Sequence, residues 1–207
     1  RDLKQFRLWY AQSGTPVVEA NGEYDAAKKT YSLTLKQSLG ATPGQPIKKP
    51  MPIPVRIGLH GPSGRALPLT LEGENATGPD ERVLELNDAE QRFVFVNVEE
   101  TPLLSLGRHF SAPVNFKTPL SRTDRAHLMA RDADPFNRWE AGQGLATEVL
   151  LEMADAAAAG RTPSADKTYL DAIGEALARA EDDPAFAAFM LSPPSENELA
   201  MAKTPVD

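Results

Sequence analysis

The fold of this chain is decided by the stretch Ala133-Asp134-Pro135-Phe136-Asn137-Arg138-Trp139-Glu140-Ala141-Gly142-Gln143. Asp134 followed by Pro135 begins a helix, because the Asp side chain accepts hydrogen bonds from free backbone N–H groups and Pro at the first helical position loses none. Apolar residues then recur at helical spacing until Gly160 ends the helix. They are Phe136, Trp139, Ala146, Val149, Leu150, Met153 and Ala157. Before this helix the pattern predicts short strands, and after it only helices.

The residues before the helix show the alternation of half-buried strands. Tyr31, Leu33 and Leu35 alternate with polar residues, which is the period of 2 expected when one face is buried. Six to eight such segments follow one another, separated by turns rich in Pro and Gly, with one turn expected at Asn21-Gly22. Because no helical segment intervenes, the pattern predicts an antiparallel β-sandwich.

The residues after the strands predict five helices. The first covers Ser121–Asp132, and the helix that begins at Asp134-Pro135 is the second and longest. A third carries Leu170, Ile173 and Leu177, Asp183-Pro184 begins a fourth, and the capping-box spacing of Ser195 and Glu198 begins a fifth. The helix pairs are similar to the start of a solenoid.

Composition and charge exclude several functional classes. Residues 1–120 carry 14 Lys and Arg against 13 Asp and Glu, and residues 121–207 carry 8 against 16. This balance, neutral and then acidic, argues against a nucleic-acid surface. The absence of Cys excludes disulfides and thiolate metal sites and fits a cytoplasmic protein. No apolar run approaches the roughly 18–20 residues that span a bilayer, so no membrane partner is expected.

Three motifs in order carry a family resemblance. FRLWYAQSGTP near the start, DPFNRWEAGQ in the middle and LSPPSENE near the end resemble the bacterial aminopeptidase N family of gluzincin-type zinc exopeptidases. The resemblance runs along nearly all 207 residues and matches the region that follows the catalytic domain. It implies an immunoglobulin-like sandwich and then the start of an α-helical domain. The boundaries expected are 1–10 for a junction helix, 11–120 for the sandwich and 121–207 for the helices.

The resemblance also implies a function for the complete protein. The parent would be a zinc-dependent enzyme that removes N-terminal amino acids from peptides, and this region would brace the catalytic domain and help enclose its chamber. Its partners would be that domain and the remaining helices, while peptides would bind only the parent. The family's catalytic and zinc-binding residues lie upstream, so none is carried over to this chain. Because the start has neither a signal core nor an initiator Met, we expect a piece of a longer protein.

The residues themselves provide no catalytic, cofactor-binding or metal site. A zinc peptidase needs two His one helical turn apart with a Glu between them and a third ligand, but His60, His109 and His127 are scattered and no HExxH occurs. Gly73-Glu74-Asn75-Ala76 is similar to a GAMEN substrate loop, yet it lacks the central Ala-Met and is interpreted as a chance likeness. The chain alone is therefore predicted not to be an enzyme.

Two segments keep alternative interpretations. Leu3, Phe6 and Trp9-Tyr10 predict a short helix, which either joins a preceding domain or packs on its own sandwich. Trp139 is interpreted as a core anchor with Arg138 or Glu140 as a pairing residue, and the alternative is that this helix start borders the parent's substrate channel. For the chain as a whole, the alternative is a free-standing β-sandwich binding module with a helical tail.

Overall fold

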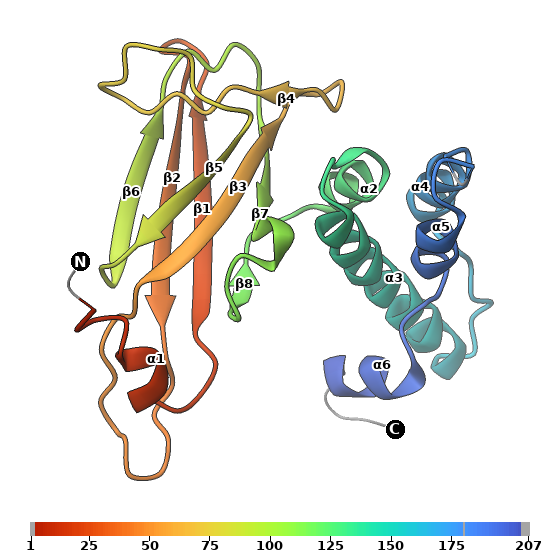
Figure 1. Ribbon diagram of the computed structural model, residues 1–207. Coiled ribbons are helices and arrows are strands. Elements are labelled where there is room, and N and C mark those ends of the chain that lie inside the picture. The colour runs from red at the N-terminus through yellow and green to blue at the C-terminus, as the bar shows by residue number, and fades with distance from the viewer. Residues whose placement is uncertain (1–2, 180, 204–207) are drawn as a thin grey trace. The chain divides into compact units, whose positions relative to one another are not determined.

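A computed structural model describes residues 3–179 and 181–203 of the chain. The chain forms two compact units, Arg1–Pro119 and Leu120–Asp207. The first unit is built mainly from strands and the second from helices (Figure 1). The predicted fold class, a β-sandwich followed by helices, is therefore confirmed.

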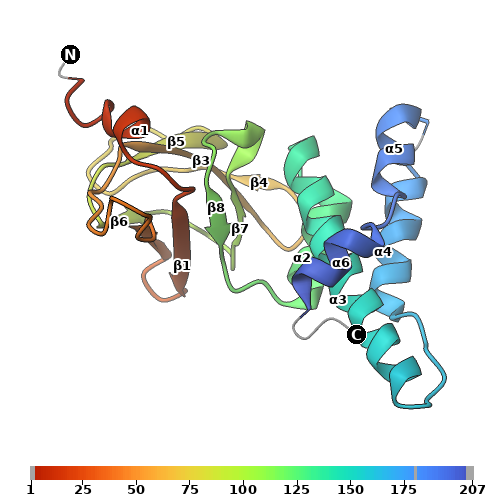
Figure 2. The same cartoon turned by 90° about the horizontal axis from the view of Figure 1, so that it is seen from below.

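The described strands of the first unit form two sheets. One sheet has the order β6-β2-β1-β8, and in the other β3 pairs with β4, β5 and β7. In Figure 2, β3 and β5 lie above β1 and β6. All pairs are antiparallel except β1 with β8, which is parallel and which the sequence pattern did not predict. The strands are β1 (Val17–Asp25), β2 (Thr30–Ser38), β3 (Ile53–His60), β4 (Ala66–Leu67), β5 (Glu81–Leu86), β6 (Glu90–Phe95), β7 (Leu103–Leu106) and β8 (Asn115–Lys117).

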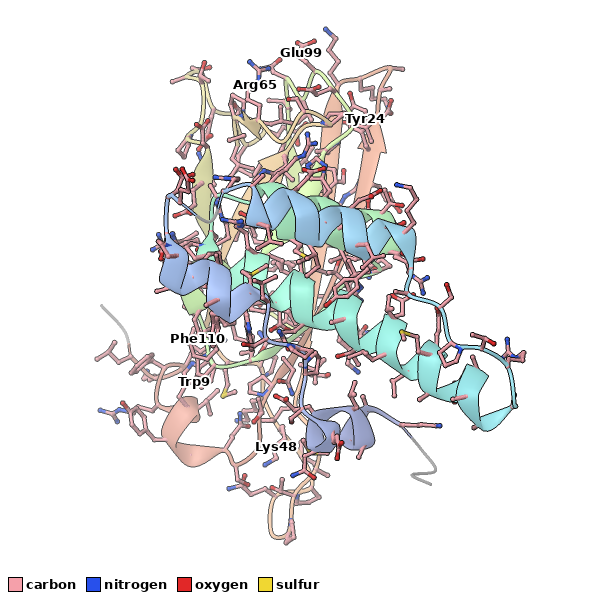
Figure 3. The ribbon with its side chains drawn as sticks, turned by 90° about the vertical axis from the view of Figure 1, so that its right-hand side faces the viewer. Trp9, Tyr24, Lys48, Arg65, Glu99 and Phe110 are labelled. Atoms are coloured by element: carbon pink, nitrogen blue, oxygen red, sulfur yellow. The ribbon has the colours of Figure 1, made fainter. Side chains whose placement is uncertain are left out.

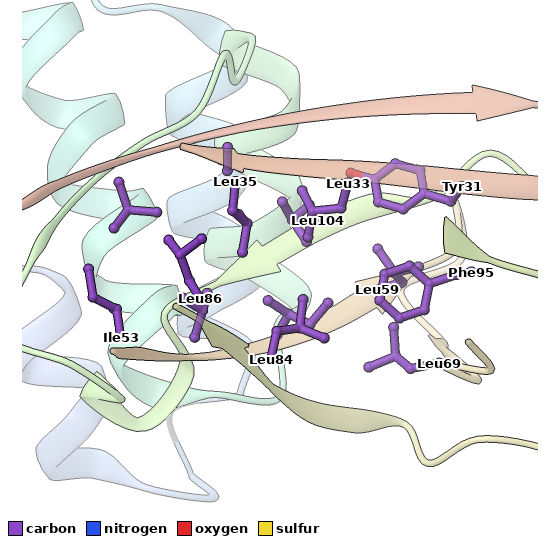
Figure 4. Packing of buried hydrophobic residues seen from close by; sticks show 14 of the residues in the cluster. Tyr31, Leu33, Leu35, Ile53, Leu59, Leu69, Leu84, Leu86, Phe95 and Leu104 are labelled. Carbon is purple, nitrogen blue, oxygen red and sulfur yellow. The ribbon is translucent and has the colours of Figure 1, made fainter. Parts of the chain in front are cut away.

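The core of this unit lies between the two sheets. Alternate residues of each strand point inward, and side chains from the two sheets face one another (Figure 4). The tilted ring pair of Tyr31 and Phe95, with centroids 6.5 Å apart, belongs to this core. The buried face predicted for Tyr31, Leu33 and Leu35 is confirmed, since all three are at most 5% exposed, and Ser32 between them is buried as well, at 8%.

The turn expected at Asn21-Gly22 is wrong. β1 continues through both residues to Asp25, and the hairpin turn falls at residues 26–29. There the Asp25 carboxylate accepts hydrogen bonds from the backbone N–H groups of Ala27 and Lys28, each at 3.0 Å. Gly22 serves a different purpose: a Cβ at this position would meet the Tyr31 ring. The glycine makes room for a buried side chain and does not form the turn.

The second unit contains five described helices, and four of them begin where the sequence predicts; for α4 the sequence predicted a helix but no starting residue. They are α2 (Arg122–Arg131), α3 (Pro135–Ala158), α4 (Lys167–Leu177), α5 (Pro184–Met190) and α6 (Glu196–Ala202). A Ser or Asp precedes each one, and its side chain accepts a hydrogen bond from a backbone N–H of the first turn. The capping box predicted at Ser195 and Glu198 is confirmed. None of the described helices combines the length and apolarity needed to cross a membrane.

The buried face of α3 differs from the expectation. Of the seven apolar residues predicted to line it, only Ala146 and Val149 are buried, and Phe136 is 37% exposed. The buried residues of α3 are Asn137, Ala141, Gly142, Leu145, Ala146 and Val149. A Cβ on Gly142 would lie only 3.2 Å from Met190 and 3.4 Å from Met129. The close approach of α2 and α5 at this glycine therefore turns the small-residue face of α3 inward.

Arg122 joins three helices of the second unit. Its guanidinium contacts Glu148 at 2.7 Å, Glu152 at 2.5 Å and Asp166 at 3.0 Å. Glu148 and Glu152 lie one turn apart on α3, and Asp166 caps the start of α4. Hydrogen bonds to Glu152, Glu148 and Asp166 raise the pKa of Arg122 above its ordinary value. One cation thus fixes how α2, α3 and α4 meet.

Candidate functional site

The three histidines do not come together. His60 is buried at the end of β3, His109 is 55% exposed in the turn Arg108–Phe110, and His127 is half-buried on α2. Among residues 3–179 and 181–203, no three His, Cys, Asp or Glu side chains gather where they could hold a metal ion. The described part of the chain therefore offers no ligand set for zinc. That the whole chain lacks a metal site stays a prediction.

A charged cluster on the sandwich surrounds Glu81. Its carboxylate contacts Arg56 at 2.7 Å, Arg108 at 3.3 Å and His109 at 3.3 Å. Burial of Glu81 opposes ionisation, but the Arg56 hydrogen bond and the charges of Arg108 and His109 outweigh it and hold the pKa of Glu81 below 4.5. Arg108 is only 5% exposed and fits where Gly58 has no side chain. The cluster anchors the turn that follows β7.

Sequence reasoning missed this cluster because its members lie on three segments. The chain after β7 has positive φ at Gly107 (74°), His109 (54°) and Phe110 (50°). Positive φ is costly for a bulky residue such as Phe110. The ion pairs to Glu81 hold the turn in this conformation. The only sequence signal was the glycine at position 107, which directly follows β7.

The loop at Gly73–Ala76 has a structural explanation. Glu74 receives hydrogen bonds from both Nη atoms of Arg82, at 2.7 and 2.8 Å, and one from the backbone N–H of Leu71 at 2.9 Å. The bond from Arg82 is the main cause of the lowered pKa of Glu74. The carboxylate is therefore engaged in closing its own turn, as the chance-likeness interpretation implies.

Three acidic residues that stand in adjacent pairs in the sequence, Glu99, Glu100 and Asp183, also have structural partners. Glu99 contacts Lys29 at 2.5 Å, and Glu100 lies 3.8 Å from Arg65. Asp183 accepts a hydrogen bond from the backbone N–H of Phe186 and so caps α5. These roles are those of surface ion pairs and of a helix cap.

Arg138, in the central motif, stabilises the end of a neighbouring helix. Its Nε donates to the carbonyl oxygen of Met129 at 3.1 Å, and Nη1 of Arg179 donates to that of Ala130 at 3.2 Å. Both carbonyls belong to the last turn of α2, where cations are favoured. The guanidinium of Arg138 also lies 5.0 Å from the ring centroid of Phe186. Burial and the charge of Arg179 lower the pKa of Arg138.

A small pocket opens beside these arginines. Its lining residues are Arg138, Ala176, Arg179, Asp182, Asp183, Phe186, Ala187 and Met190. Cations and carboxylates line it together, and both arginines already serve α2, so the lining favours no particular ligand. That the start of α3 borders a substrate channel in the parent stays a prediction.

Within the described residues, the charged groups considered above therefore make structural contacts. The large exposed apolar side chains include Leu3 (53% exposed), Phe6 (47%) and Tyr10 (84%) on the sandwich, and Phe189 (54%) on the helical unit. Large apolar side chains that gather at a surface mark sites of interaction. The candidate functional site is therefore a contact surface.

Family models match both units. A domain of unknown function with an Ig-like fold, DUF3458, matches residues 14–119. Its C-terminal companion DUF3458_C, described as ARM repeats, matches residues 122–207. The chain belongs to the DUF3458 family. The Ig-like sandwich and the solenoid-like helices expected from the motifs are thereby confirmed.

Curated relatives of the chain are bacterial aminopeptidases N. The chain is 39% identical to aminopeptidase N of Escherichia coli K12 over 200 residues, which is 96% of this chain and 22% of that protein. It is 43% identical to aminopeptidase N of Caulobacter vibrioides, covering 97% of this chain and 22% of that protein. Aminopeptidase N of Haemophilus influenzae is 31% identical, and the match covers 100% of this chain and 23% of that protein. The resemblance read from the motifs is confirmed, and the chain spans less than a quarter of each relative.

A solved structure has the same architecture. Aminopeptidase A of Legionella pneumophila, crystallised in complex with aspartic acid, superposes with a TM-score of 0.76 and 26% identity. The match covers 98% of this chain and 21% of that one. The DUF3458 chain is therefore similar to one part of a larger aminopeptidase.

Proposed function

We propose that this chain is a non-catalytic region of a zinc-dependent aminopeptidase that removes N-terminal amino acids from peptides. The proposal is supported by one observation above all: nearly the whole chain matches about a fifth of several aminopeptidases, in two units of the DUF3458 family. The described residues contain no ligand set for zinc. The zinc ion and the peptide site would then belong to the rest of the parent.

In this proposal the region braces the catalytic domain and helps enclose its chamber. The rigid sandwich supplies a fixed base, and the capped helices start an array that continues in the parent. Such arrays bury their apolar faces against neighbouring repeats. The partners are the catalytic domain and the remaining helices, and the parent works in the cytoplasm.

The test compares three proteins: the chain alone, the full-length parent, and the parent lacking this region. Zinc content and hydrolysis of alanyl p-nitroanilide are measured for each. We expect zinc and turnover in the parent and neither in the chain alone. The shortened parent is expected to unfold at lower temperature and to lose activity. Stoichiometric zinc with turnover in the chain alone, or a shortened parent as stable and active as the full-length one, would contradict the proposal.

Enclosure of the chamber needs a separate measurement. The full-length parent is given a short peptide and an unfolded protein with the same N-terminal residues. We expect rapid cleavage of the peptide and little cleavage of the long chain, because an enclosed chamber admits only short substrates. Equal rates for the two substrates would leave bracing as the only role.

A further inference from the structure

Residues 3–12 form consecutive helical turns with two distinct faces. The series of backbone hydrogen bonds begins with the N–H of Arg7, which donates to the carbonyl of Leu3, and ends with the N–H of Gln12, which donates to that of Leu8; α1 (Leu8–Ala11) is the regular part. Burial alternates with the helical period along the segment. Gln5, Leu8, Trp9 and Gln12 form the half-buried inner face, and Leu3, Phe6, Arg7 and Tyr10 form the exposed outer face. Each set has the spacing i, i+3, i+4, i+7.

The inner face fastens this segment to the sandwich. Trp9 packs against the core, and its Nε1 donates to the carbonyl of Pro52 at 2.9 Å (Figure 3). Gln5 Nε2 donates to the carbonyl of Asn87 at 2.5 Å. Gln12 exchanges two hydrogen bonds with the backbone of Lys49, at 2.9 and 2.6 Å. Such a short helix is unstable alone, so these contacts define its position.

The outer face carries large apolar side chains that stay exposed on the surface of the sandwich unit. Leu3 is 53% exposed, Phe6 47% and Tyr10 84%. The rings of Phe6 and Tyr10 meet edge to face, with centroids 6.0 Å apart, and so hold each other in place. Exposed Arg7 lies among them, and no ion pair of Arg7 is found within the described residues. Aromatic and Arg side chains are the residue types enriched in binding hot spots.

We infer that this outer face is the surface on which the catalytic domain of the parent docks, an inference that rests on the proposed function. The spacing of its anchors is that of a helix laid into a groove. The groove on the partner is apolar, takes the Phe6 and Tyr10 rings, and carries a carboxylate opposite Arg7. More than three quarters of each aminopeptidase N relative lies outside the matched region, so the parent supplies the chain length for such a partner. Because the inner face fixes the helix beforehand, little conformational entropy is lost on docking.

The test measures amide hydrogen exchange of residues 3–12 in the isolated chain and in the full-length parent. We expect exchange at least tenfold slower in the parent. Tyr10→Ser and Arg7→Glu should each remove most of that extra protection while leaving the isolated chain unchanged. The matched control is Ile47→Ser, since Ile47 is as exposed as Tyr10, at 85% against 84%.

Three results would overturn the inference. One is equal exchange of residues 3–12 in the parent and in the isolated chain. Another is a loss of protection with Ile47→Ser as large as that with Tyr10→Ser. The third is a dimer of the isolated chain that Tyr10→Ser dissociates, which would make a second copy the occupant. Aminopeptidase activity of the same parent samples is measured in parallel, so that failure of the proposed function is seen separately from failure of the docking face.

Discussion

Trp139 of α3 stacks on Phe189 of α5, with ring centroids 5.4 Å apart and planes inclined by 23°. Phe136 lies beside Trp139 with centroids 6.2 Å apart. Phe136, Trp139 and Phe189 form an aromatic cluster at the surface of the helical unit, since Phe189 is 54% exposed and Trp139 half-buried. The tryptophan of the central motif therefore joins two helices from outside and is not a core anchor, contrary to the expectation from sequence.

Replacing this tryptophan should have an intermediate effect on stability. Trp139→Ala is expected to lower the free energy of unfolding of the helical unit by roughly 1–3 kcal/mol. The Trp139 side chain is only half-buried, so the change removes a partly buried apolar surface and one stacked ring pair. Denaturant unfolding followed by far-UV circular dichroism measures it. A loss above about 4 kcal/mol would mean that Trp139 is fully buried in solution, and no loss would mean that the stack does not form.

The start of α3 was predictable and its buried face was not, for a physical reason. Capping depends on residues three apart, so Asp134 and Pro135 suffice to place the helix end. The choice of buried face depends on neighbours far along the chain. The sequence shows a stripe of large apolar residues along α3. The neighbouring helices α2 and α5 instead approach α3 at Gly142, which has no side chain.

In the sandwich and in the candidate site, too, local features were predictable from the sequence and contacts between distant residues were not. Strand alternation is local and was read correctly, whereas the need for Gly22 beside Tyr31 arises from a strand pair that sequence does not reveal. At the N-terminus the spacing of Leu3, Phe6 and Trp9-Tyr10 predicted a helix. It did not say which stripe packs inward, because both stripes of this segment carry large aromatic residues.

Gly22→Ala tests the role given to this glycine. The added methyl group would meet the Tyr31 ring, so we expect a loss of roughly 1–3 kcal/mol in the stability of the sandwich. Burial raises the pKa of Tyr31 to about 12, and displacement of the ring should return it toward 10.0. Denaturant unfolding and spectrophotometric titration measure the two effects.

The matched control for this change is Gly40→Ala, because no atom lies within 4 Å of a Cβ at Gly40. It should leave both stability and the tyrosine titration unchanged. If the two variants behave alike, contact with Tyr31 is not the reason for glycine at position 22.

Acid should weaken the helical unit through Asp166. A backbone hydrogen bond from Tyr169, and then the pairing with Arg122, lower the pKa of Asp166 below 3.8. A carboxylate with a lowered pKa in the folded state adds stability above its unfolded pKa, and this contribution is lost as the pH falls through the folded value. Stability should therefore decline below about pH 4. Asp166→Asn should flatten this decline, because Asn still caps the helix but does not titrate.

Thermal unfolding between pH 2.5 and 7 provides the measurement. Asp171→Asn is the control, since it removes an exposed carboxylate from the same helix, where Asp171 pairs with Lys167. A decline that is equally steep in the Asp166→Asn protein would assign the acid sensitivity to other groups.

The isolated chain should self-associate through the open end of the helical unit. Phe186, Phe189, Met190, Leu191 and Leu199 lie close together in the last helices, and some of them are expected to be exposed: Met190 is 4% exposed, whereas Phe189 (54%) and Leu191 (40%) are open. Apolar side chains that gather beside the aromatic cluster favour contact with a second copy when no other helix covers them. Sedimentation velocity over a range of concentrations should show a weak dimer.

Three variants test which surface forms this dimer. Phe189→Ser should weaken the dimer at least tenfold. Leu177→Ser, at 46% exposure on α4, and Tyr10→Ser on the sandwich should leave it unchanged. A strict monomer at every concentration would contradict this prediction. It would also favour the alternative interpretation of the chain as a free-standing β-sandwich binding module.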